Sequence, residues 1–269
     1  MDKNLNRVKD TWNQWAETRY EKYRTDAVLT KLIHSPESAF HPTTYSLIKS
    51  VFPSLEGKQV CVPSSGDNHA VFAFHLMGAK VTSCDIAEKQ LENAMAIACK
   101  YGWDIAFVCE DTMKLSKIES DKYDFVYTSN GVHVWIHDLR SMYKNICRIL
   151  KNEGVYILQD VHPFTRPFGE DTDKIIVKKP YDATGPMGDV PNYHWRMQDI
   201  MNAMLSSGLN MKHVEEMYAE YGTFWFESSG KRETLSKEEL EKLYHWEKNP
   251  LAAIPQWLSI YAVRNTSGI

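Results

Sequence analysis

Features that define several protein classes are missing from this chain of 269 residues. No apolar run approaches the ~20 residues that are needed to span a bilayer, and the first 15 residues hold no apolar signal segment. We therefore expect a cytoplasmic protein with no membrane partner. Hydrophobic residues make up 43% and charged residues 25% of the chain, which is typical of a soluble globular protein and argues against a disordered one.

Cysteine and positive charge are scarce as well. The five cysteines form no CxxC pair, so we expect reduced, buried thiols and no zinc site. The sequence also lacks the HExxH spacing that would indicate a metal. The formal net charge of −4 gives no electrostatic footprint for nucleic acid. We therefore predict no metal and no nucleic-acid partner.

Between residues 58 and 160 the sequence alternates predicted strands and helices. Short apolar, β-branched runs predict strands, and the stretches between them carry apolar residues near helical spacing. Such an alternation predicts an α/β fold with a doubly wound, Rossmann-like parallel sheet and helices on both faces. The strands are expected at residues 59–62, 80–84, 105–108, 123–128 and 155–158. Further along, a helix, a strand, a charged helix and a final strand are expected at 197–207, 211–217, 236–248 and 257–263.

The turn after the first predicted strand reads Ser64-Ser65-Gly66-Asp67-Asn68. A dinucleotide-binding turn needs the glycines of a GxGxxG motif, and the single glycine here disfavours NAD and FAD. The GK[ST] of a P-loop is missing too, which excludes that motif. Small residues and open backbone amides at a helix N-terminus still suit a carboxylate or the edge of a ribose.

Acidic residues follow the second and third strands. Asp85 stands where a carboxylate can accept hydrogen bonds from ribose hydroxyls. Asp111, followed by Thr112, stands where a carboxylate could accept from an adenine amino group. Alone, each acid is more often a solvated loop residue or a helix cap. Because ligands of such sheets bind beyond the carboxyl ends of the strands, the two acids beside the small-residue turn together favour a nucleoside ligand.

Three longer stretches carry a family resemblance. They read VCVPSSGDNHAVFAFHLMGAKVTSCDIAEKQLENA, EDTMKL and YDFVYTSNGVHVWIHDLRSMYKNICRILKNEGVYILQD, within about residues 58–162. In order and spacing they resemble the class I S-adenosylmethionine (SAM)-dependent methyltransferases, and HWRMQDIMNAMLSSGL and PQWLSIYAVR are similar to that family's last helix and final strand. The resemblance implies a seven-stranded sheet with an antiparallel last strand. It also implies SAM as the cofactor and S-adenosylhomocysteine (SAH) as its product.

The resemblance also implies roles for single residues, although the first turn departs from the family's DxGxGxG pattern. Val62 stands at the position of the acid, Ser64 at that of the first glycine and Asn68 at that of the third. The missing acid helps to hold the methionine amino group in the family, and Asp67 or a group of the N-terminal helix is expected to replace it. The residues expected to bind the cofactor are Tyr20, Ser64, Ser65, Gly66, Asp85, Ile86, Asp111, Thr112, Asn130 and Gly131.

Residues 12–23 predict a helix on which Trp12 and Trp15 share a face, as do Tyr20 and Tyr23. In the family an N-terminal helix often closes over SAM, so Tyr20 is expected to belong to a lid. The alternative is that these aromatic residues only dock the helix. We therefore divide the chain into an N-terminal helical lid segment, 1–50, and a methyltransferase domain, 51–269, with a substrate-side insertion at about 164–195.

Aromatic residues make up 12% of the chain, and many lie outside the predicted strands and helices of the sheet. Aromatic side chains anchor cores more often than they line pockets, but buried Trp and Tyr need a polar partner. We therefore expect a chamber lined by rings, which would suit a flat ring or a cationic amine. The residues expected to bind the substrate are His133, His162, Tyr193, His194, Trp195, Tyr221 and Trp225.

Methyl transfer from a sulfonium is an in-line displacement that depends mainly on proximity and orientation. A base is needed only where the acceptor must lose a proton, and histidine is the usual candidate at neutral pH. His133, after the fourth strand, and His162, after the fifth, are the predicted catalytic residues, although a lone histidine is more often a surface or packing residue.

These residues predict a SAM-dependent methyltransferase that modifies N, O or S of a small molecule and works as a monomer or weak homodimer. The alternative is a SAM-binding sensor or non-catalytic partner subunit, because the first turn departs from the family. A Rossmann oxidoreductase is disfavoured by the same turn, and a protein acceptor stays open.

Overall fold

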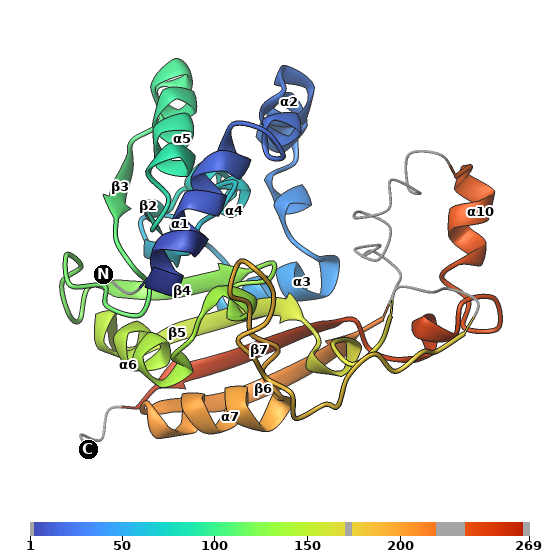
Figure 1. The fold of residues 1–269 in the computed structure, drawn as a ribbon. Coiled ribbons are helices and arrows are strands. Elements are labelled where there is room, and N and C mark those ends of the chain that lie inside the picture. The colour runs from blue at the N-terminus through green and yellow to red at the C-terminus, as the bar shows by residue number, and fades with distance from the viewer. Residues whose placement is uncertain (1–2, 170–173, 219–234, 266–269) are drawn as a thin grey trace.

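A seven-stranded sheet in the order β3-β2-β1-β4-β5-β7-β6 forms the centre of the molecule (Figure 1). The computed structural model describes residues 3–169, 174–218 and 235–265. The strands are β1 (Gln59–Pro63), β2 (Lys80–Asp85), β3 (Ile105–Cys109), β4 (Tyr123–Ser129), β5 (Leu150–Val161), β6 (Leu209–Met217) and β7 (Trp257–Arg264). β7 pairs antiparallel with both of its neighbours, and the other strands run parallel to one another. This arrangement confirms the predicted fold class.

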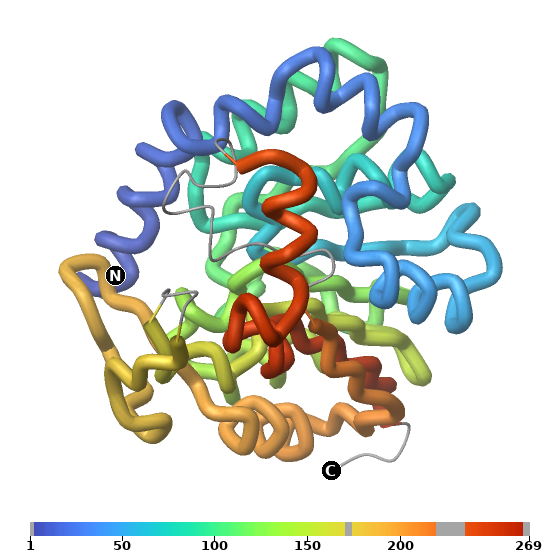
Figure 2. The backbone as a smooth tube through the Cα atoms, turned by 90° about the vertical axis from the view of Figure 1, so that its right-hand side faces the viewer, coloured from blue at the N-terminus to red at the C-terminus, as the bar shows by residue number. Residues whose placement is uncertain are grey.

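Helices pack on both faces of the sheet. They are α1 (Lys3–Ala16), α2 (Asp26–His34), α3 (Pro42–Val51), α4 (His69–Leu76), α5 (Glu88–Tyr101), α6 (Leu139–Ile149), α7 (Met197–Ser206) and α10 (Lys237–Lys242). On one face α6 and α7 share a buried core with the sheet. On the other face α2, α3, α4 and α5 build a second core. The short helix α10 lies to one side of the sheet (Figures 1 and 2).

Local sequence explains most of these elements. The apolar run of α4 is buried from Ala70 to Phe74, so this helix is apolar on all sides and lies within a core. Asp138 caps α6 by accepting a hydrogen bond from the Ser141 amide at 3.0 Å. α5 ends at Gly102, whose φ of +68° is cheap for glycine. These boundaries agree with the sequence pattern to within a residue or two.

The N-terminal region and α10 differ from the predicted boundaries. The first helix was expected at 12–23, but α1 begins at Lys3 and ends at Ala16. Tyr20 lies in the turn that follows, where its amide donates to the Trp15 carbonyl at 2.9 Å. A short 3-10 helix then covers Glu21–Arg24. The charged helix ends at Lys242, six residues before its predicted end. Among the described residues, no helix is long and apolar enough to cross a membrane.

Candidate active site

A cavity opens at the carboxyl ends of β1 to β4, next to α1. About 760 Å³ of space that no protein atom fills lies within it, part of which is open to solvent. The structure brings all of the residues predicted to bind the cofactor into the lining of this cavity. Sequence reasoning did not assign the site to Leu5, Val8, Trp12, Met113, Trp135 and Ile136, which also line it.

The turn after β1 keeps the backbone of a glycine-rich turn with only one glycine. Ser64, Gly66 and Asn68 all have left-handed φ angles, of +53°, +54° and +64°. Asn68 is fully buried, and its side-chain amide donates to the Gly66 carbonyl at 2.8 Å. The Ser83 hydroxyl on β2 lies 2.5 Å from the other amide atom, Oδ1 of Asn68. Side-chain hydrogen bonds therefore hold a backbone path that glycine would adopt unaided.

Asp85 ties this turn to the end of β2. Its Oδ2 accepts from the Gly66 amide at 2.9 Å, and its Oδ1 accepts from the Ala87 amide at 2.8 Å. The side chain is buried, and burial raises the pKa of Asp85 while hydrogen bonds from the amides of Ala87, Gly66 and Ile86 oppose the rise. A carboxylate has about four lone-pair sites, and the amides of Gly66, Ala87 and Ile86 use three of them, so Asp85 can still accept a hydrogen bond from a hydroxyl group.

Asp111 and Thr112 form the next part of the wall. Asp111 Oδ1 accepts from the Met113 amide at 2.9 Å. Burial raises the pKa of Asp111, while that amide hydrogen bond and the positive charge of Lys114 lower it. The Thr112 and Ser64 hydroxyl oxygens lie 2.8 Å apart, which joins the ends of β1 and β3. The other carboxylate oxygen of Asp111, Oδ2, can therefore accept a hydrogen bond from an amino group at this wall.

Aromatic rings from α1 and from the loop after β4 meet over the cavity. The ring of Trp12 lies 5.3 Å from that of Tyr20 and 5.8 Å from that of Trp135. Trp15 lies 5.5 Å from Trp12 and 5.7 Å from Trp135. Together the four residues form an aromatic cluster that makes part of the wall apolar and that offers ring faces to a cation.

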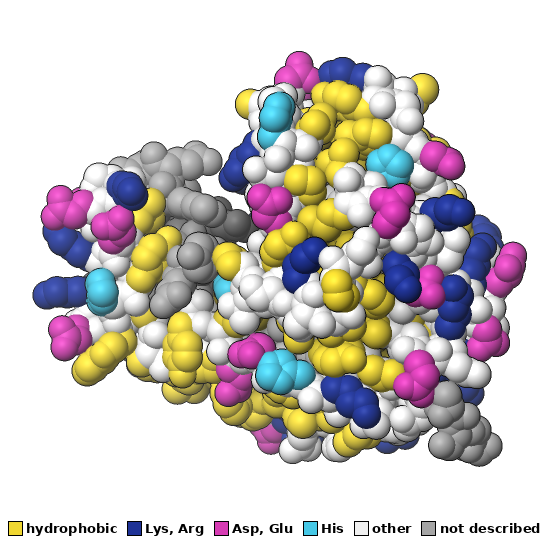
Figure 3. All heavy atoms as spheres, turned by 180° about the vertical axis from the view of Figure 1, so that it is seen from behind, with side chains coloured by type: hydrophobic (Ala, Val, Ile, Leu, Met, Phe, Trp, Pro, Cys, Tyr) yellow, Lys and Arg dark blue, Asp and Glu magenta, His cyan; other side chains and the backbone are white. Residues whose placement is uncertain are grey.

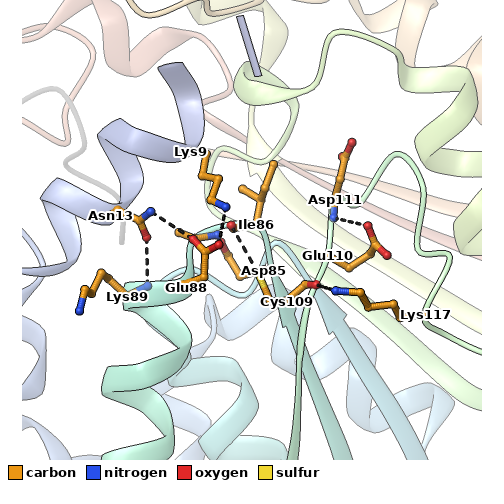
Figure 4. A network of polar contacts seen from close by, with 11 residues as sticks. Lys9, Asn13, Asp85, Ile86, Glu88, Lys89, Cys109, Glu110, Asp111 and Lys117 are labelled. Atoms are coloured by element: carbon orange, nitrogen blue, oxygen red, sulfur yellow. Dashed lines mark hydrogen bonds and ion pairs between the residues drawn. The ribbon is translucent and has the colours of Figure 1, made fainter. Parts of the chain in front are cut away.

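The start of α5 holds α1 in place over the cavity (Figure 4). Lys9 of α1 forms an ion pair with Glu88, and the Asn13 side-chain amide donates to the same carboxylate at 3.2 Å. The Lys89 amide in turn donates to Asn13 Oδ1 at 3.0 Å. The hydrogen bond with Glu88 raises the pKa of Lys9, so the pair stays charged at neutral pH. We call these contacts the α1 clamp.

The first predicted catalytic residue, His133, lies behind the cavity wall rather than in its lining. Its Nδ1 lies 2.9 Å from Asp160 Oδ2, and its Nε2 lies 2.5 Å from the Tyr143 hydroxyl. Burial alone would raise the pKa of Asp160, but the attraction to His133 and hydrogen bonds from that residue lower it. Both ring nitrogens therefore contact the protein, and the histidine supports the Val132 loop from behind.

The second predicted catalytic residue, His162, is fully buried and also lies outside the lining. Its Nε2 lies 2.8 Å from Glu216 Oε1 on β6, and its Nδ1 accepts from the Phe164 amide at 3.1 Å. Burial lowers the pKa of His162, although Glu216 opposes the shift. No contact in the structure aims either histidine at the cavity, and their catalytic roles stay predictions.

The described residues predicted to bind the substrate lie along the outside of this wall. The rings of Tyr193 and Trp195 are stacked, with their centres 5.7 Å apart. The Tyr193 amide donates to the Val134 carbonyl, and Trp195 Nε1 donates to the Ile136 carbonyl, each at 2.8 Å. His194 lies between them in the chain, while Tyr221 and Trp225 lie outside the described residues.

Two further expectations concern single positions. Val62 is buried within β1, so the position that holds an acid in the family is part of the core here. Asp67 does line the cavity, and its Oδ1 accepts from the His69 amide at 3.0 Å. Within the part of the chain that the structure describes, no group of three or more His, Cys, Asp or Glu side chains is placed to hold a metal ion.

Comparison with known proteins decides the class of this site. Residues 63–158 match the model of a protein family described as a methyltransferase domain. This stretch of the chain is therefore similar to a methyltransferase domain. The uncharacterized methyltransferase YbaJ of Bacillus subtilis is 28% identical over 131 residues, which cover 49% of this chain and 51% of that protein. The match thus spans about half the length of this curated relative.

Solved structures of SAM-dependent methyltransferases share the fold of this chain. A SAM-dependent methyltransferase from Mesorhizobium loti superposes with a TM-score of 0.61 at 20% identity, over 82% of this chain and 97% of that chain. Magnesium protoporphyrin IX methyltransferase from Synechocystis PCC 6803, solved with bound SAH, gives a TM-score of 0.60 at 16% identity, over 97% of this chain and 100% of that one. The fold is that of the class I enzymes, and SAM is the cofactor of the class.

Proposed function

We propose that this protein transfers the methyl group of SAM to N, O or S of a small molecule, with a flat ring or an amine as the acceptor. The observation that carries the proposal is the cavity, in which the strand-end acids and the glycine-like turn meet beneath the aromatic cluster. The residues fit SAM. Asp85 has a lone pair for a ribose hydroxyl, and Asp111 has one for the adenine amino group.

The methionine part of SAM has a place beside the turn after β1. Gly66 lines the cavity, and its φ of +54° is one that favours glycine. Asp67 also lines this end of the cavity and offers a carboxylate for an ammonium group. We therefore propose that Asp67 takes over from the acid that the family has at the position of Val62.

The mechanism needs little more than binding and orientation from this chain. Bound SAM supplies a methyl group on a sulfonium that already carries the positive charge. The aromatic cluster and α1 exclude water from the cavity, and ring faces favour a cation nearby. The loop around Asn130 and Val132 is held from behind by His133, so the wall that faces the acceptor is fixed. Proximity and orientation of this kind can contribute roughly 7–11 kcal/mol.

A small molecule is the acceptor class that the surface supports. The net charge is −4, and on the face shown in Figure 3 basic and acidic side chains are interspersed rather than gathered by sign. Nucleic acid would call for a basic surface. We propose that the protein acts as a monomer or weak homodimer. A Haloferax volcanii methyltransferase that shares the fold was solved with an activator protein. It is 16% identical, with a TM-score of 0.62 over 94% of this chain and 97% of that one.

Calorimetry and a transfer screen test the proposal together. SAM and SAH are titrated into the full chain, and tritiated SAM is then incubated with a panel of small aromatic and amine acceptors. We expect both cofactor forms to bind and at least one acceptor to gain the label. Binding without transfer to any acceptor would favour the second candidate, a SAM sensor or partner subunit. No binding of either form by the folded chain would overturn the proposal.

A further inference from the structure

The insertion between β5 and α7 brings basic side chains from distant positions together. In Figure 1 it is the yellow-to-gold chain that links these two elements. The Lys178 amide donates to the Pro167 carbonyl at 2.7 Å, so Arg166 and Lys179 lie on adjacent segments of the insertion. The Lys179 ammonium donates to the Ala183 carbonyl at 2.6 Å. This hydrogen bond holds the Lys179 ammonium group against the second half of the insertion.

The second half of the insertion adds His194 to the group. The His194 amide donates to the Thr184 carbonyl at 2.8 Å, one residue beyond the carbonyl that holds Lys179. The positive charges of Arg166 and Lys179 both act on the His194 ring. We call Arg166, Lys179 and His194 the basic triad.

The basic triad lies beside the wall of the cofactor cavity. Tyr193 and Trp195, the two neighbours of His194, hydrogen-bond to the backbone of residues 134–136. Trp135 and Ile136 of that segment line the cavity. The chain around His194 therefore packs against a segment whose other residues form part of the cavity wall.

The triad has more positive charge than the described residues neutralise. Among them, neither Arg166 nor Lys179 has a carboxylate within the 4.0 Å of an ion pair, and the buried Nδ1 of His194 has no hydrogen-bond partner. Asp160 faces Arg166 but is already engaged by His133 and by two backbone amides. Asp182 faces Lys179 at longer range.

The energetics of burial make this arrangement unusual. Burial lowers the pKa of Arg166 and of Lys179, and burial together with these two cations lowers the pKa of His194 to about 4. A desolvated cation is costly unless an anion accompanies it. A guanidinium fork matches a carboxylate or a phosphate through two parallel hydrogen bonds. Within the part of the chain that the structure describes, no carboxylate forms an ion pair with Arg166 or Lys179, so an oxyanion from a ligand would suit this group.

We propose that Arg166, Lys179 and His194 bind a carboxylate or phosphate group of the methyl acceptor. This inference rests on the proposed methyl transfer, because the anionic group would anchor the acceptor beside the wall while its reacting atom reaches the methyl donor. The acceptor class narrows accordingly to small ring or amine compounds that carry an acidic group. The guanidinium of Arg166 would donate two parallel hydrogen bonds to the anionic group. Lys179 would donate its remaining ammonium N–H, and His194 would contact the anion through a ring nitrogen.

Simple anions test the basic triad directly. Inorganic phosphate and benzoate are titrated into the full chain with and without SAH, and benzamide serves as the neutral match to benzoate. We expect at least one of the two anions to bind, and benzoate to bind at least tenfold more tightly than benzamide. Arg166→Met should abolish the preference, whereas Arg140→Met, which removes an exposed arginine on α6, should retain it.

Each possible result decides the inference. Equal binding of benzoate and benzamide by the natural chain, together with no binding of phosphate, would overturn it, as would an unchanged preference in Arg166→Met. Should Arg166→Met fail to fold, Lys179→Met on the neighbouring segment takes its place, with an expected loss of at least threefold in anion affinity. The titrations without SAH decide the triad alone, so a failure of SAH binding would count against the proposed function and not against the anion site.

Discussion

Ser64 shows at the scale of one residue how this turn departs from its family and keeps the same shape. Its φ of +53° lies in the left-handed region, where side chains other than glycine cost roughly 1–2 kcal/mol. In exchange its hydroxyl lies 2.8 Å from that of Thr112 and joins the ends of two strands. The substitution is therefore tolerated because a hydrogen bond offsets the strain.

A pair of variants separates strain from hydrogen bonding at this position. Ser64→Ala removes the contact with Thr112 and keeps the strain, whereas Ser64→Gly removes both. We expect Ser64→Gly to be more stable than Ser64→Ala by about 1 kcal/mol, after the entropic cost of glycine in the unfolded chain. Urea unfolding monitored by circular dichroism measures the difference. Equal stability of the two variants would show that the strain at Ser64 is no larger than the entropic cost of glycine in the unfolded chain.

Asp85 is the residue on which cofactor binding should depend most. In Asp85→Asn one oxygen becomes an NH2 group, so an amide of Gly66 or Ala87 and a ribose hydroxyl lose an acceptor. Hydrogen bonds to a charged group contribute ~1.5–3 kcal/mol, and SAH affinity should fall roughly 10- to 100-fold. Calorimetry measures it, with Asp104→Asn on the exposed surface as the matched control. An unchanged SAH affinity in Asp85→Asn would remove this residue from the site.

The residues of the cavity differ in how far sequence could predict them. Asp85 and Asp111 could be predicted because the end of a strand is a local feature, and parallel strands bring such ends to one edge. Leu5 and Val8 were missed because they reach the cavity only through the docking of α1, although their spacing with Trp12 predicts one helix face. Arg166, 13 positions from Lys179, carries no local signal at all.

At the scale of elements, α1 covers the cavity through buried residues such as Leu5 and Val8 and through the α1 clamp. The α1 clamp consists of side chains that remain partly exposed, with side-chain exposures of 23% for Lys9 and 43% for Glu88. Exposed ion pairs are worth about 0.2–1 kcal/mol. The helix is therefore held firmly enough to cover the cavity and loosely enough to leave it, which a cofactor that must be exchanged requires.

Loss of the α1 clamp should speed the release of cofactor. In Glu88→Gln the charge that holds Lys9 is gone, and the SAH dissociation rate should rise up to about fivefold, with a smaller effect at high salt because screening already weakens the pair. Stopped-flow fluorescence can follow it, since Trp12 and Trp15 lie on the moving helix. Glu92→Gln, one turn further along α5, is the control. If both variants release SAH at the natural rate, the clamp has no role in exchange.

Element boundaries were predictable where a local signal marks them and not where packing decides. The Asp138 cap and the Gly102 end could be predicted from residue type. The end of α1 at Ala16 could not, because the chain beyond it continues with residues that suit a helix, and side chains from other elements, Arg24 and Asn93, donate to the Ala16 carbonyl. α10 is shorter than its charge pattern predicts because none of its residues is buried, and packing of a buried face is what stabilises most helices in proteins.

At the scale of the whole molecule, the high aromatic content divides between two places. Phe40, Phe74, Phe125 and Tyr127 pack ring against ring in the core behind the sheet. The aromatic cluster over the cavity draws on α1 and Trp135 instead. Within the described residues, the rings that line the cavity thus come from the first half of the chain, whereas the expected chamber was assigned mainly to the second.

Whole-molecule stability should fall as the pH drops below neutral. Burial lowers the pKa values of His75, His162 and His194, the last to about 4 with help from the cations of the basic triad. In the unfolded chain these histidines titrate near ~6.5. Between pH 7.5 and 5.5 the unfolded state therefore takes up protons that the folded state does not, so the free energy of unfolding decreases as the pH falls.

Urea midpoints at pH 7.5 and 5.5 measure this loss, because carboxylates with ordinary pKa values near ~4 stay ionised across the window. Asp85 and Asp111, whose pKa values burial raises, act in the opposite direction, and we expect the three histidines to outweigh them. His194→Gln should show a smaller loss than the natural chain, since the group that resists protonation in the fold is gone. His34→Gln, at an exposed position of α2, provides the control and should keep the full loss. A natural chain that is equally stable at both pH values, or more stable at pH 5.5, would contradict the burial of neutral histidines. Phosphate bound at the triad would stabilise a protonated His194 and reduce the loss, so repeating the pair of measurements with and without phosphate connects stability to the anion site.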